Sequence, residues 1–396
     1  MNRSLISAFR PLASSRVPIT RCVPQYRHFS ATSRRSLSAV FAETENPELN
    51  QVLTQIQEKI ILPAYLPEAQ RKLIHNKKKS DYIQRNPVVI ELDGLEHTFK
   101  TIDRFKDIPN SGKAYQEATQ LMTTKEEWDN LGTLLAGYKK AGIRLKRQQY
   151  DAAIRRAGKH RQPYAIIECA KQSSKTGFLL NNTSSVALLL ASVNIKIIKP
   201  AGEESEVQEA LKWNQLVWDL IQRPEHLRDA ASPREQPHFN PAIRGLILYA
   251  QTSAVKEQQA AEASVEQLIR DVRDNVEFIT SAWKDQLSEP LTKSPYLNYV
   301  NPRVEPLSRQ HMQHIAPYYY VHLVAQNIKG IELAQEIIGD DASDLTPVRE
   351  ALEQNLESFI RADASAGARR NKAGWGHAYE AVTGRKPNWV DALSSE

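Results

Sequence analysis

Apolar residues recur at three- and four-residue intervals along most of this chain, which is the spacing of one face of an α-helix. The stretch from Thr124 to Lys171 shows the pattern most clearly and predicts three consecutive short helices. Thr124 stands three residues before Glu127, so their side chains can cap the first helix reciprocally. Gly142 follows that helix, and Pro163 suits the first turn of the third. Short helices in series predict an all-α fold, namely an irregular α-solenoid of helical hairpins.

Helical spacing also appears on both sides of this stretch. It predicts helices from Pro47 to a point before Pro63, from Pro67 onward, and over residues 183–193, 205–222, 242–254, 257–287, 318–338 and 347–362. The predicted helix over 257–287 is the longest, and its apolar positions from Val265 to Trp283 form a seam. This seam favours packing against the chain's own helices over a coiled coil with a second chain. The connections without regular structure are predicted at residues 194–206, 223–241 and 287–317.

One segment alternates between apolar and polar residues instead. Val88, Ile90 and Leu92 precede Asp93-Gly94, a pair typical of a two-residue hairpin turn. The pattern predicts one small β-hairpin near residues 88–99. Because two strands alone are marginally stable, we expect the hairpin to lie against helices.

These patterns divide the chain into five predicted regions. They are a transit peptide (1–36), an N-terminal helical region with the hairpin (37–122), helical repeats (123–254), a C-terminal helical region (255–363) and a basic, aromatic tail (364–396). The tail mixes cations with Trp375, Tyr379 and Trp389. Three positions are predicted for it: on RNA, in a protein groove, or against its own domain.

The first 36 residues have the composition of a mitochondrial presequence. They contain seven arginines and many serines, and the first acidic residue is Glu43. The segment RHFSATSRRS resembles a fungal-type presequence that is cleaved in two steps, which implies a mature chain beginning near Leu37. The predicted location is therefore the mitochondrial matrix; the alternative is a basic tail that is retained. No apolar run approaches the roughly 20 residues of a membrane span.

The presequence changes the meaning of the charge. The whole chain carries +6, and removing seven arginines and no acid leaves −1. Residues 37–200 contain 25 basic and 17 acidic residues, whereas residues 201–396 contain 20 basic and 29 acidic residues. A positive half and a negative half predict a polarised surface, with the first half suited to an anion and the second to solvent or a basic partner such as a protein.

Motifs for catalysis or cofactor binding are missing from the sequence. It has no phosphate-binding glycine loop, dinucleotide fingerprint or nucleophile elbow, so we expect neither an enzyme nor a cofactor. His311, His314 and His322 lack supporting cysteines or carboxylates, and no metal site is predicted. Cys169 and most of the Tyr318–Tyr320 cluster are predicted to be core residues, with one tyrosine ring exposed.

The strongest chemical signal is a run of cations. Nine basic residues stand against the single acid Asp151, and they are Lys139, Lys140, Arg144, Lys146, Arg147, Arg155, Arg156, Lys159 and Arg161. A helical hairpin is too small to bury them all, so the run predicts a positive surface that contacts RNA phosphates without regard to sequence. An acidic protein or anionic lipid is the alternative partner.

The segment from Gln149 to Ser192 resembles one pentatricopeptide-type repeat followed by the first helix of another. Tyr150 matches the aromatic at the start of the first helix, Ala157-Gly158-Lys159 the turn between helices, and Val186 the equivalent start 36 residues later. The resemblance extends loosely over residues 124–254 and implies a noncatalytic mitochondrial protein that binds RNA. The slot that usually reads a base holds Asp151, so the resemblance implies phosphate contact and no base-by-base code.

The sequence thus predicts a noncatalytic matrix protein that binds mitochondrial RNA or the mitoribosome and acts in mitochondrial gene expression. The alternative is a protein-interaction scaffold or assembly factor for a respiratory complex of the inner membrane. This alternative would use the helix over 257–287 and the tail.

Overall fold

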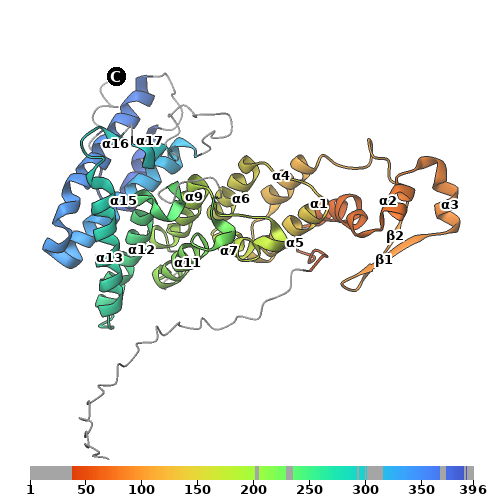
Figure 1. Cartoon of the computed structure of the whole chain (residues 1–396), viewed down its shortest axis with the longest axis horizontal. Helices are drawn as coiled ribbons and strands as arrows, with labels where there is room; N and C mark the ends of the chain where they lie inside the picture. The colour runs from red at the N-terminus through yellow and green to blue at the C-terminus, as the bar shows by residue number, and fades with distance from the viewer. Residues whose placement is uncertain are drawn as a thin grey trace, which may run out of the picture. The chain divides into compact units, whose positions relative to one another are not determined.

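The computed structural model describes residues 38–200, 205–228, 235–291, 294–298, 300, 315–365, 372–387 and 389 (Figure 1). The predicted presequence lies outside the described residues, which all belong to one compact unit, Leu37–Glu396. The described part of this unit is all-α apart from one two-stranded antiparallel sheet, which confirms the predicted fold class.

One row of helices runs through the whole array. Each helix of the row packs against the next, in the order α1 (Pro47–Ile56), α4 (Ser111–Leu121), α6 (Arg147–Lys159), α9 (Thr183–Val193), α12 (Pro241–Ala260) and α15 (Pro317–Ile338). A second row contains α5 (Lys125–Lys140), α7 (Pro163–Lys171) and α11 (Val207–Leu220), again packed in chain order. Pairs of helices stacked in this way are the units of an α-solenoid.

The middle of the first row is regular. The helices α4, α6 and α9 begin at Ser111, Arg147 and Thr183, so both steps along the row are 36 residues. Gly158 on α6 faces α9, where an added Cβ would lie 2.6 Å from the Ser192 hydroxyl oxygen. A glycine at this position therefore allows the two helices to approach closely. The predicted repeat turn is displaced, because Ala157-Gly158-Lys159 lies inside α6.

The predicted helix ends of the central stretch are confirmed. Thr124 and Glu127 form the reciprocal cap of α5, Gly142 has φ +72° just after that helix, and Pro163 is the first residue of α7. Helix α6 begins at Arg147. The Gln149 side chain accepts a hydrogen bond of 2.7 Å from the backbone N–H of Lys146, the residue before the helix. The short helices α8 (Ser173–Thr176) and α10 (Ile195–Ile198) complete this region. The one-turn α10 lies in a segment predicted as a loop.

The N-terminal helices carry the hairpin. The first helix ends before Pro63, as predicted: α1 ends at Ile56 and is followed by a π-helical turn (Gln57–Ile61) and a 3-10 turn (Leu62–Tyr65) that contains Pro63. Pro63 is tolerated there because first-turn N–H groups need no intrahelical partner. Next come α2 (Glu68–Ile74), a 3-10 turn (Lys77–Lys79) and α3 (Ser80–Arg85). The strands β1 (Val88–Leu92) and β2 (Leu95–Phe99) pair from Val88↔Phe99 to Leu92↔Leu95, as predicted.

The hairpin has a core of its own. Val88 and Phe99 pack in a buried cluster with Leu62, Leu66, Ile74 and Ile102, separate from the main core. The expectation that helical residues support the two strands is therefore confirmed. Short 3-10 turns also occur at Pro224–His226, Pro237–Phe239 and Gly339–Leu345, and α14 (Pro295–Asn298) lies in the proline-rich connection.

The predicted helix over 257–287 is confirmed only from Glu266 to Lys284. Residues 257–260 end α12, Glu262 takes φ +53°, and α13 (Glu266–Lys284) begins only where the apolar seam starts. The seam buries Val272, Val276, Ile279 and Trp283, and α13 packs against α12 and α15. The prediction that the chain's own helices cover this seam is confirmed.

The C-terminal tail docks on its own domain. Helix α17 (Lys372–Thr383) follows α16 (Thr346–Ser365) and packs against α15. Trp375, Tyr379 and Trp389 are buried in the main core, so these aromatic rings do not form an exposed surface. Arg385 pairs with Glu332 at 2.6 Å and also with Glu353. Of the three predicted positions for the tail, the intramolecular one is confirmed for these residues.

Candidate nucleic-acid interface

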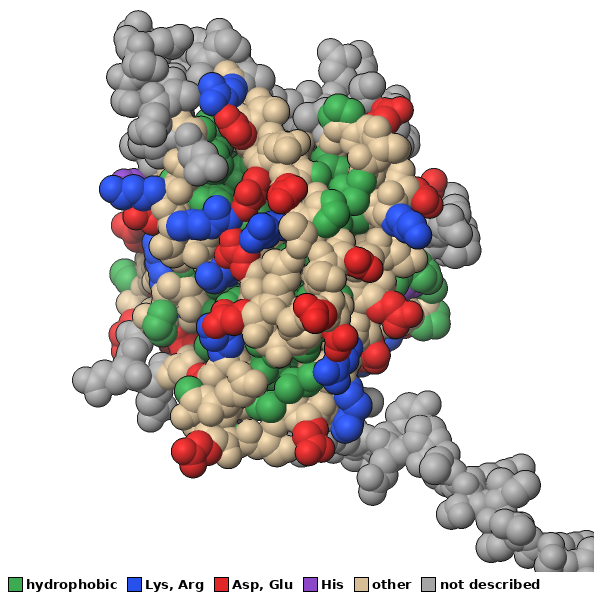
Figure 2. Space-filling view, turned by 90° about the vertical axis from the view of Figure 1, so that its left-hand side faces the viewer, with side chains coloured by type: hydrophobic (Ala, Val, Ile, Leu, Met, Phe, Trp, Pro, Cys, Tyr) green, Lys and Arg blue, Asp and Glu red, His purple; other side chains and the backbone are tan. Residues whose placement is uncertain are grey.

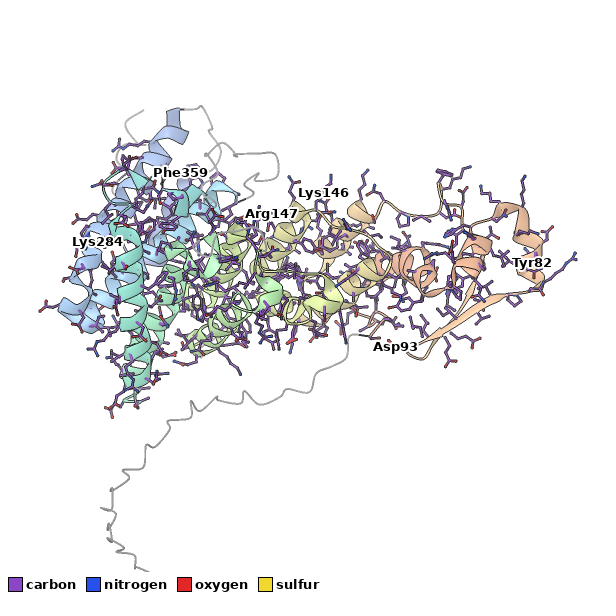
Figure 3. All side chains as sticks on the ribbon, in the orientation of Figure 1. Tyr82, Asp93, Lys146, Arg147, Lys284 and Phe359 are labelled. Carbon is purple, nitrogen blue, oxygen red and sulfur yellow. The ribbon has the colours of Figure 1, made fainter. Side chains whose placement is uncertain are left out.

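The nine predicted cations lie along one turn of the array. Lys139 and Lys140 end α5, Arg144 and Lys146 lie in the joint, and Arg161 follows α6. The remaining four are on α6, and they are Arg147, Arg155, Arg156 and Lys159. Figure 3 shows Lys146 and Arg147 near each other at the upper edge of the array, away from Tyr82 at the hairpin end.

Arg147 is part of the contact between α6 and α9. Its guanidinium donates to the Ser184 hydroxyl, and its Nε lies 3.6 Å from Asp151 Oδ2. Asp151 is only 2% exposed and also accepts a hydrogen bond of 2.6 Å from Ser185. Burial lowers the pKa of Arg147, and Asp151 opposes that shift. Asp151 therefore balances a half-buried arginine and is not accessible to a base.

Two further arginines also connect neighbouring helices. Arg156 donates to Thr119 Oγ1 at 2.6 Å and to the Gln116 carbonyl at 3.1 Å, which joins α6 to α4. Burial lowers the pKa of Arg156 as well. Arg161 donates to the Lys199 carbonyl and pairs with Glu206. The expectation that the whole cation run faces solvent is therefore wrong for Arg147, Arg156 and Arg161.

Five cations of the run are exposed: Lys139 and Lys140 at the end of α5, and three in the joint and on α6. Arg144, Lys146 and Lys159 are exposed, and within the described part of the chain no carboxylate forms an ion pair with them. Arg155 is half-buried near Tyr319, whose pKa is raised by burial and lowered in part by this arginine. Arg144, Lys146 and Lys159 are free to contact an external anion.

The two lysines at the end of α5 line a shallow cleft. It has a volume of about 310 Å³ and is lined by Ser38, Ala39, Tyr65, Thr133, Ala136, Gly137, Lys139, Lys140 and Lys175. Lys139 Nζ donates to the Ser174 carbonyl at 2.6 Å, and Lys140 Nζ lies 5.1 Å from the Tyr65 ring centre. Lys175 was not among the nine predicted cations, because only the packing of α5 on α8 brings it beside Lys139 and Lys140.

The surface that a pentatricopeptide-type repeat would use is largely closed here. Helix α9 is buried along its whole length, and α15 packs on it together with α6 and α12. Ala187, the predicted counterpart of Asp151 in the next unit, is fully buried. Of the tyrosine cluster, Tyr320 is in the core and Tyr318 is exposed, as predicted. Neither base-reading position is therefore open to a nucleotide.

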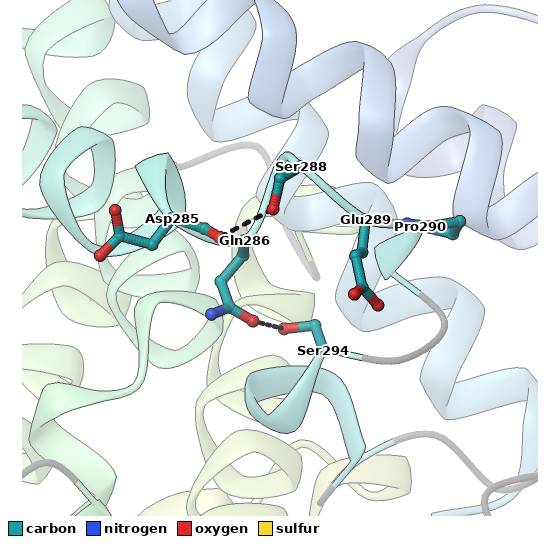
Figure 4. Close-up of a pocket in the computed structure, with 6 residues that line it drawn as sticks. All are labelled: Asp285, Gln286, Ser288, Glu289, Pro290 and Ser294. Carbon is teal, nitrogen blue, oxygen red and sulfur yellow. Dashed lines mark hydrogen bonds between the residues drawn. The ribbon is translucent and has the colours of Figure 1, made fainter.

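A second hollow lies after α13, and its chemistry is different (Figure 4). It encloses about 200 Å³ and is lined by Asp285, Gln286, Ser288, Glu289, Pro290 and Ser294. Ser294 donates to Gln286 Oε1 at 3.2 Å, and Ser288 to the Asp285 carbonyl at 3.3 Å. These six lining residues include two carboxylates and no cation, so the hollow is unsuited to phosphate.

The described residues offer little for other chemistry. Among them, no group of three or more histidine, cysteine or acidic side chains is placed to hold a metal. His322 is buried and bonded to Gln326 at 2.8 Å, Cys169 is buried in the core, and His311 and His314 lie outside the described residues. No helix in the part of the chain that was searched is both long and apolar enough to cross a membrane.

The opposite end of the array has a mixed surface. Figure 2, which faces that end, shows acidic side chains interspersed with basic ones and no broad positive area. Several exposed charges are paired there, including Lys256 with Glu336 at 2.7 Å and Arg273 with Asp341 at 3.0 Å. The exposed, unpaired cations of α6 and its joint therefore belong to the other half of the chain.

Comparison with known proteins gives two matches. The model of a family described as mitochondrial ribosomal protein mS27 matches residues 27–381. The small ribosomal subunit protein mS27 of Neurospora crassa is 30% identical over 227 residues, which are 54% of this chain and 57% of that relative. The chain thus spans little more than half the length of this curated relative.

Proposed function

Because the chain belongs to the mitochondrial ribosomal protein mS27 family, we propose that it is a noncatalytic component of the small mitoribosomal subunit and acts in mitochondrial translation. The family match over residues 27–381 carries this proposal. A protein of this family works in the mitochondrial matrix, which agrees with the location predicted from the presequence. A role in assembling a respiratory complex is not favoured.

Within the subunit, the proposed partner of the basic half is ribosomal RNA. The contact would use the exposed cations Arg144, Lys146 and Lys159 together with the cleft lysines Lys139, Lys140 and Lys175. Ammonium and guanidinium groups on a fixed helical surface bind phosphates and position the protein without reading sequence. The burial of Asp151 and Ala187 supports this mode over base recognition.

The acidic half would contact neighbouring ribosomal proteins. Residues 201–396 contain 29 acidic and 20 basic residues, a balance that repels RNA and favours basic protein surfaces. We also infer that the α4–α9 region is pentatricopeptide-like, which is supported by its two 36-residue steps. The displaced turn at Ala157-Gly158-Lys159 and the long helices after α11 make it an irregular member of that class.

Sedimentation tests the proposed function. The tagged full chain, expressed in mitochondria, should co-migrate with the small ribosomal subunit, and nuclease should disrupt this co-migration. Reversing Arg144, Lys146 and Lys159 to Glu should weaken the association, because three phosphate contacts become repulsive. The matched control reverses three exposed lysines of the acidic half, Lys212, Lys284 and Lys386, and should not. Co-migration with respiratory assembly intermediates instead would contradict the proposal.

A further inference from the structure

Phe105 is the most exposed large hydrophobic side chain among the described residues. Its ring is 97% exposed, compared with 52% for Tyr82 and 44% for Val89 in the same N-terminal region. It lies in the turn between β2 and α4, next to the hairpin core. A phenylalanine displayed so fully gains nothing from the fold, since burial is what makes an aromatic ring stabilising. The ring is therefore accessible to a partner outside the chain.

The backbone of this turn is held by hydrogen bonds. Asp103 Oδ1 accepts from the Phe105 N–H at 2.9 Å, and Asp107 Oδ2 accepts from the Asp103 N–H at 2.7 Å. The Ile102 N–H donates to the Ile74 carbonyl at 2.8 Å, which ties the segment to the end of α2. Lys77 pairs with Asp103 across the same junction. The ring is thus displayed from a fixed turn.

The two segments that meet at this turn are rich in cations. Residues 71–79 and 100–107 contain eight basic and two acidic residues, and Lys77 pairs with one of these acids, Asp103. Arg104 and Lys106 are the sequence neighbours of Phe105, and both are exposed. Arg104 also lies near His75, whose pKa is lowered mainly by burial and further by Arg104 and Arg71. The exposed lysines Lys78 and Lys79 follow His75 on the adjacent 3-10 turn.

We propose that this Phe105 tip, formed by residues 77–79 and 103–107, binds single-stranded RNA. An unpaired base stacks on the Phe105 ring, while Arg104, Lys106, Lys78 and Lys79 contact the phosphates on either side. An aromatic ring with cations close to it in the chain suits a single strand, because bases can stack on the ring while phosphates contact the cations. An apolar protein groove is a poorer fit, because it would have to desolvate Arg104 and Lys106 along with the ring.

This inference deepens the proposed function, since the strand would be an unpaired segment of ribosomal RNA. It also gives a role to the Lys77–Lys79 run, which α6 and its cations do not use. The tip lies in the hairpin region, apart from the 139–161 cations, so the two contacts can be removed separately.

Binding of a labelled oligouridine to the purified full chain tests the tip. With a single strand of about twelve nucleotides, Phe105→Ala should weaken binding roughly fivefold or more, because a base stack is lost. Phe105→Trp should retain the affinity, because its ring still stacks. Val89→Ala, which truncates another exposed apolar side chain of this region, is the matched control and should bind like the wild type.

The charge contribution is measured by salt dependence. Lys78→Glu combined with Lys79→Glu should flatten the dependence of affinity on salt, whereas Phe105→Ala should leave that slope unchanged. Three results would contradict the proposed RNA contact of the Phe105 tip. They are wild-type affinity in Phe105→Ala, an equal loss of affinity in Phe105→Trp, and failure of the wild-type chain to bind the oligouridine. Circular dichroism of each variant shows that the fold is intact.

Failure of the tip and failure of the proposed function have different signatures. If the wild-type chain and Phe105→Ala both bind oligouridine equally and both co-migrate with the small subunit, only the tip is wrong. If the wild-type chain binds oligouridine through Phe105 but never co-migrates with the small subunit, the tip stands and the ribosomal role fails. Capture of an acidic peptide in place of oligouridine also counts against the tip.

Discussion

The region from α4 to α9 and the region from α12 to α17 are both helical, but different interactions hold their helices together. In the first, helices of 4 to 16 residues are joined by half-buried arginines such as Arg147 and Arg156. In the second, the long helices α12 and α15 meet backbone to backbone, since an added Cβ on Gly330 would lie 2.9 Å from the Tyr249 nitrogen. Cations thus serve two purposes in the first region, internal joints and an exposed surface.

This difference explains why composition alone could not show which of the nine cations are exposed. Counting charges treats Arg156 and Lys159 alike, yet one bonds to α4 and the other faces solvent. Substitutions can therefore separate the arginines that connect helices from the exposed cations that contact RNA, and can compare the two kinds of helix packing.

The largest effect on stability is expected where α12 crosses α15. Gly330→Ala should destabilise the fold by about 3 kcal/mol, because the new methyl group meets backbone atoms that cannot move aside. The control is Gly112→Ala on α4, where the nearest atom belongs to the flexible end of Gln149. Urea unfolding measures both. Equal midpoints for the two variants would show that the crossing is not tightly packed.

An effect of comparable size depends on pH and again involves the second region. Burial lowers the pKa of His322 to about 4, below its ordinary value of 6.5. Between these values the unfolded chain binds the proton more readily, so stability contributed by neutral His322 is present above pH 6.5 and lost toward pH 4, on the order of 3 kcal/mol in total. Unfolding should therefore show this acid loss in the wild type and much less of it in His322→Gln. An identical pH profile in the variant would contradict the assignment.

The comparison of Arg156 with Lys159 tests joints against contacts directly. Arg156→Met should cost roughly 2 kcal/mol, because bonds from a charged group to Thr119 and Gln116 are lost. Lys159→Met should change stability by less than about 0.5 kcal/mol, since the side chain is exposed. For RNA binding we expect the reverse: Lys159→Met should lower the affinity for RNA, and Arg156→Met should change it little as long as the protein remains folded. If Lys159→Met also destabilises the protein, the division into joints and contacts is wrong.

The smallest expected effect is on the cleft beside α5. Lys175→Gln should leave stability unchanged and reduce the salt dependence of RNA binding by at most one phosphate contact, roughly 0.7 in the logarithmic slope for a single strand. Anisotropy titrations at several salt concentrations measure it. A slope equal to that of the wild type would remove the cleft from the RNA contact.

Local signals predicted local structure well. The Thr124–Glu127 cap and the Asp93-Gly94 turn each depend on neighbouring residues, and each forms as expected. The break between α12 and α13 was missed, because residues 257–264 are mostly glutamate, glutamine and alanine, which favour helix, although Glu262 takes a positive φ. The arginine joints were missed for another reason: Ser184 and Thr119 lie 37 residues from the arginines they bond, and no local pattern links them.

The candidate site was predictable only in part. Nine cations in one segment indicated an anion contact, but the sequence could not tell which were exposed, nor that Lys175 lies with Lys139 and Lys140. It also could not foresee that Phe105 would be displayed, because an apolar residue between two charges looks the same whether its ring is buried or exposed. Exposure follows from tertiary packing.

Crosslinking in assembled particles shows directly whether the chain contacts ribosomal RNA through its basic half. Small mitoribosomal subunits carrying the tagged chain would be irradiated, digested, and searched by mass spectrometry for peptides that retain a nucleotide. The account predicts adducts on peptides containing residues 100–107 and 139–161, and none on α13, whose residues belong to the acidic half. Adducts confined to α13, or a chain absent from the small subunit, would contradict it.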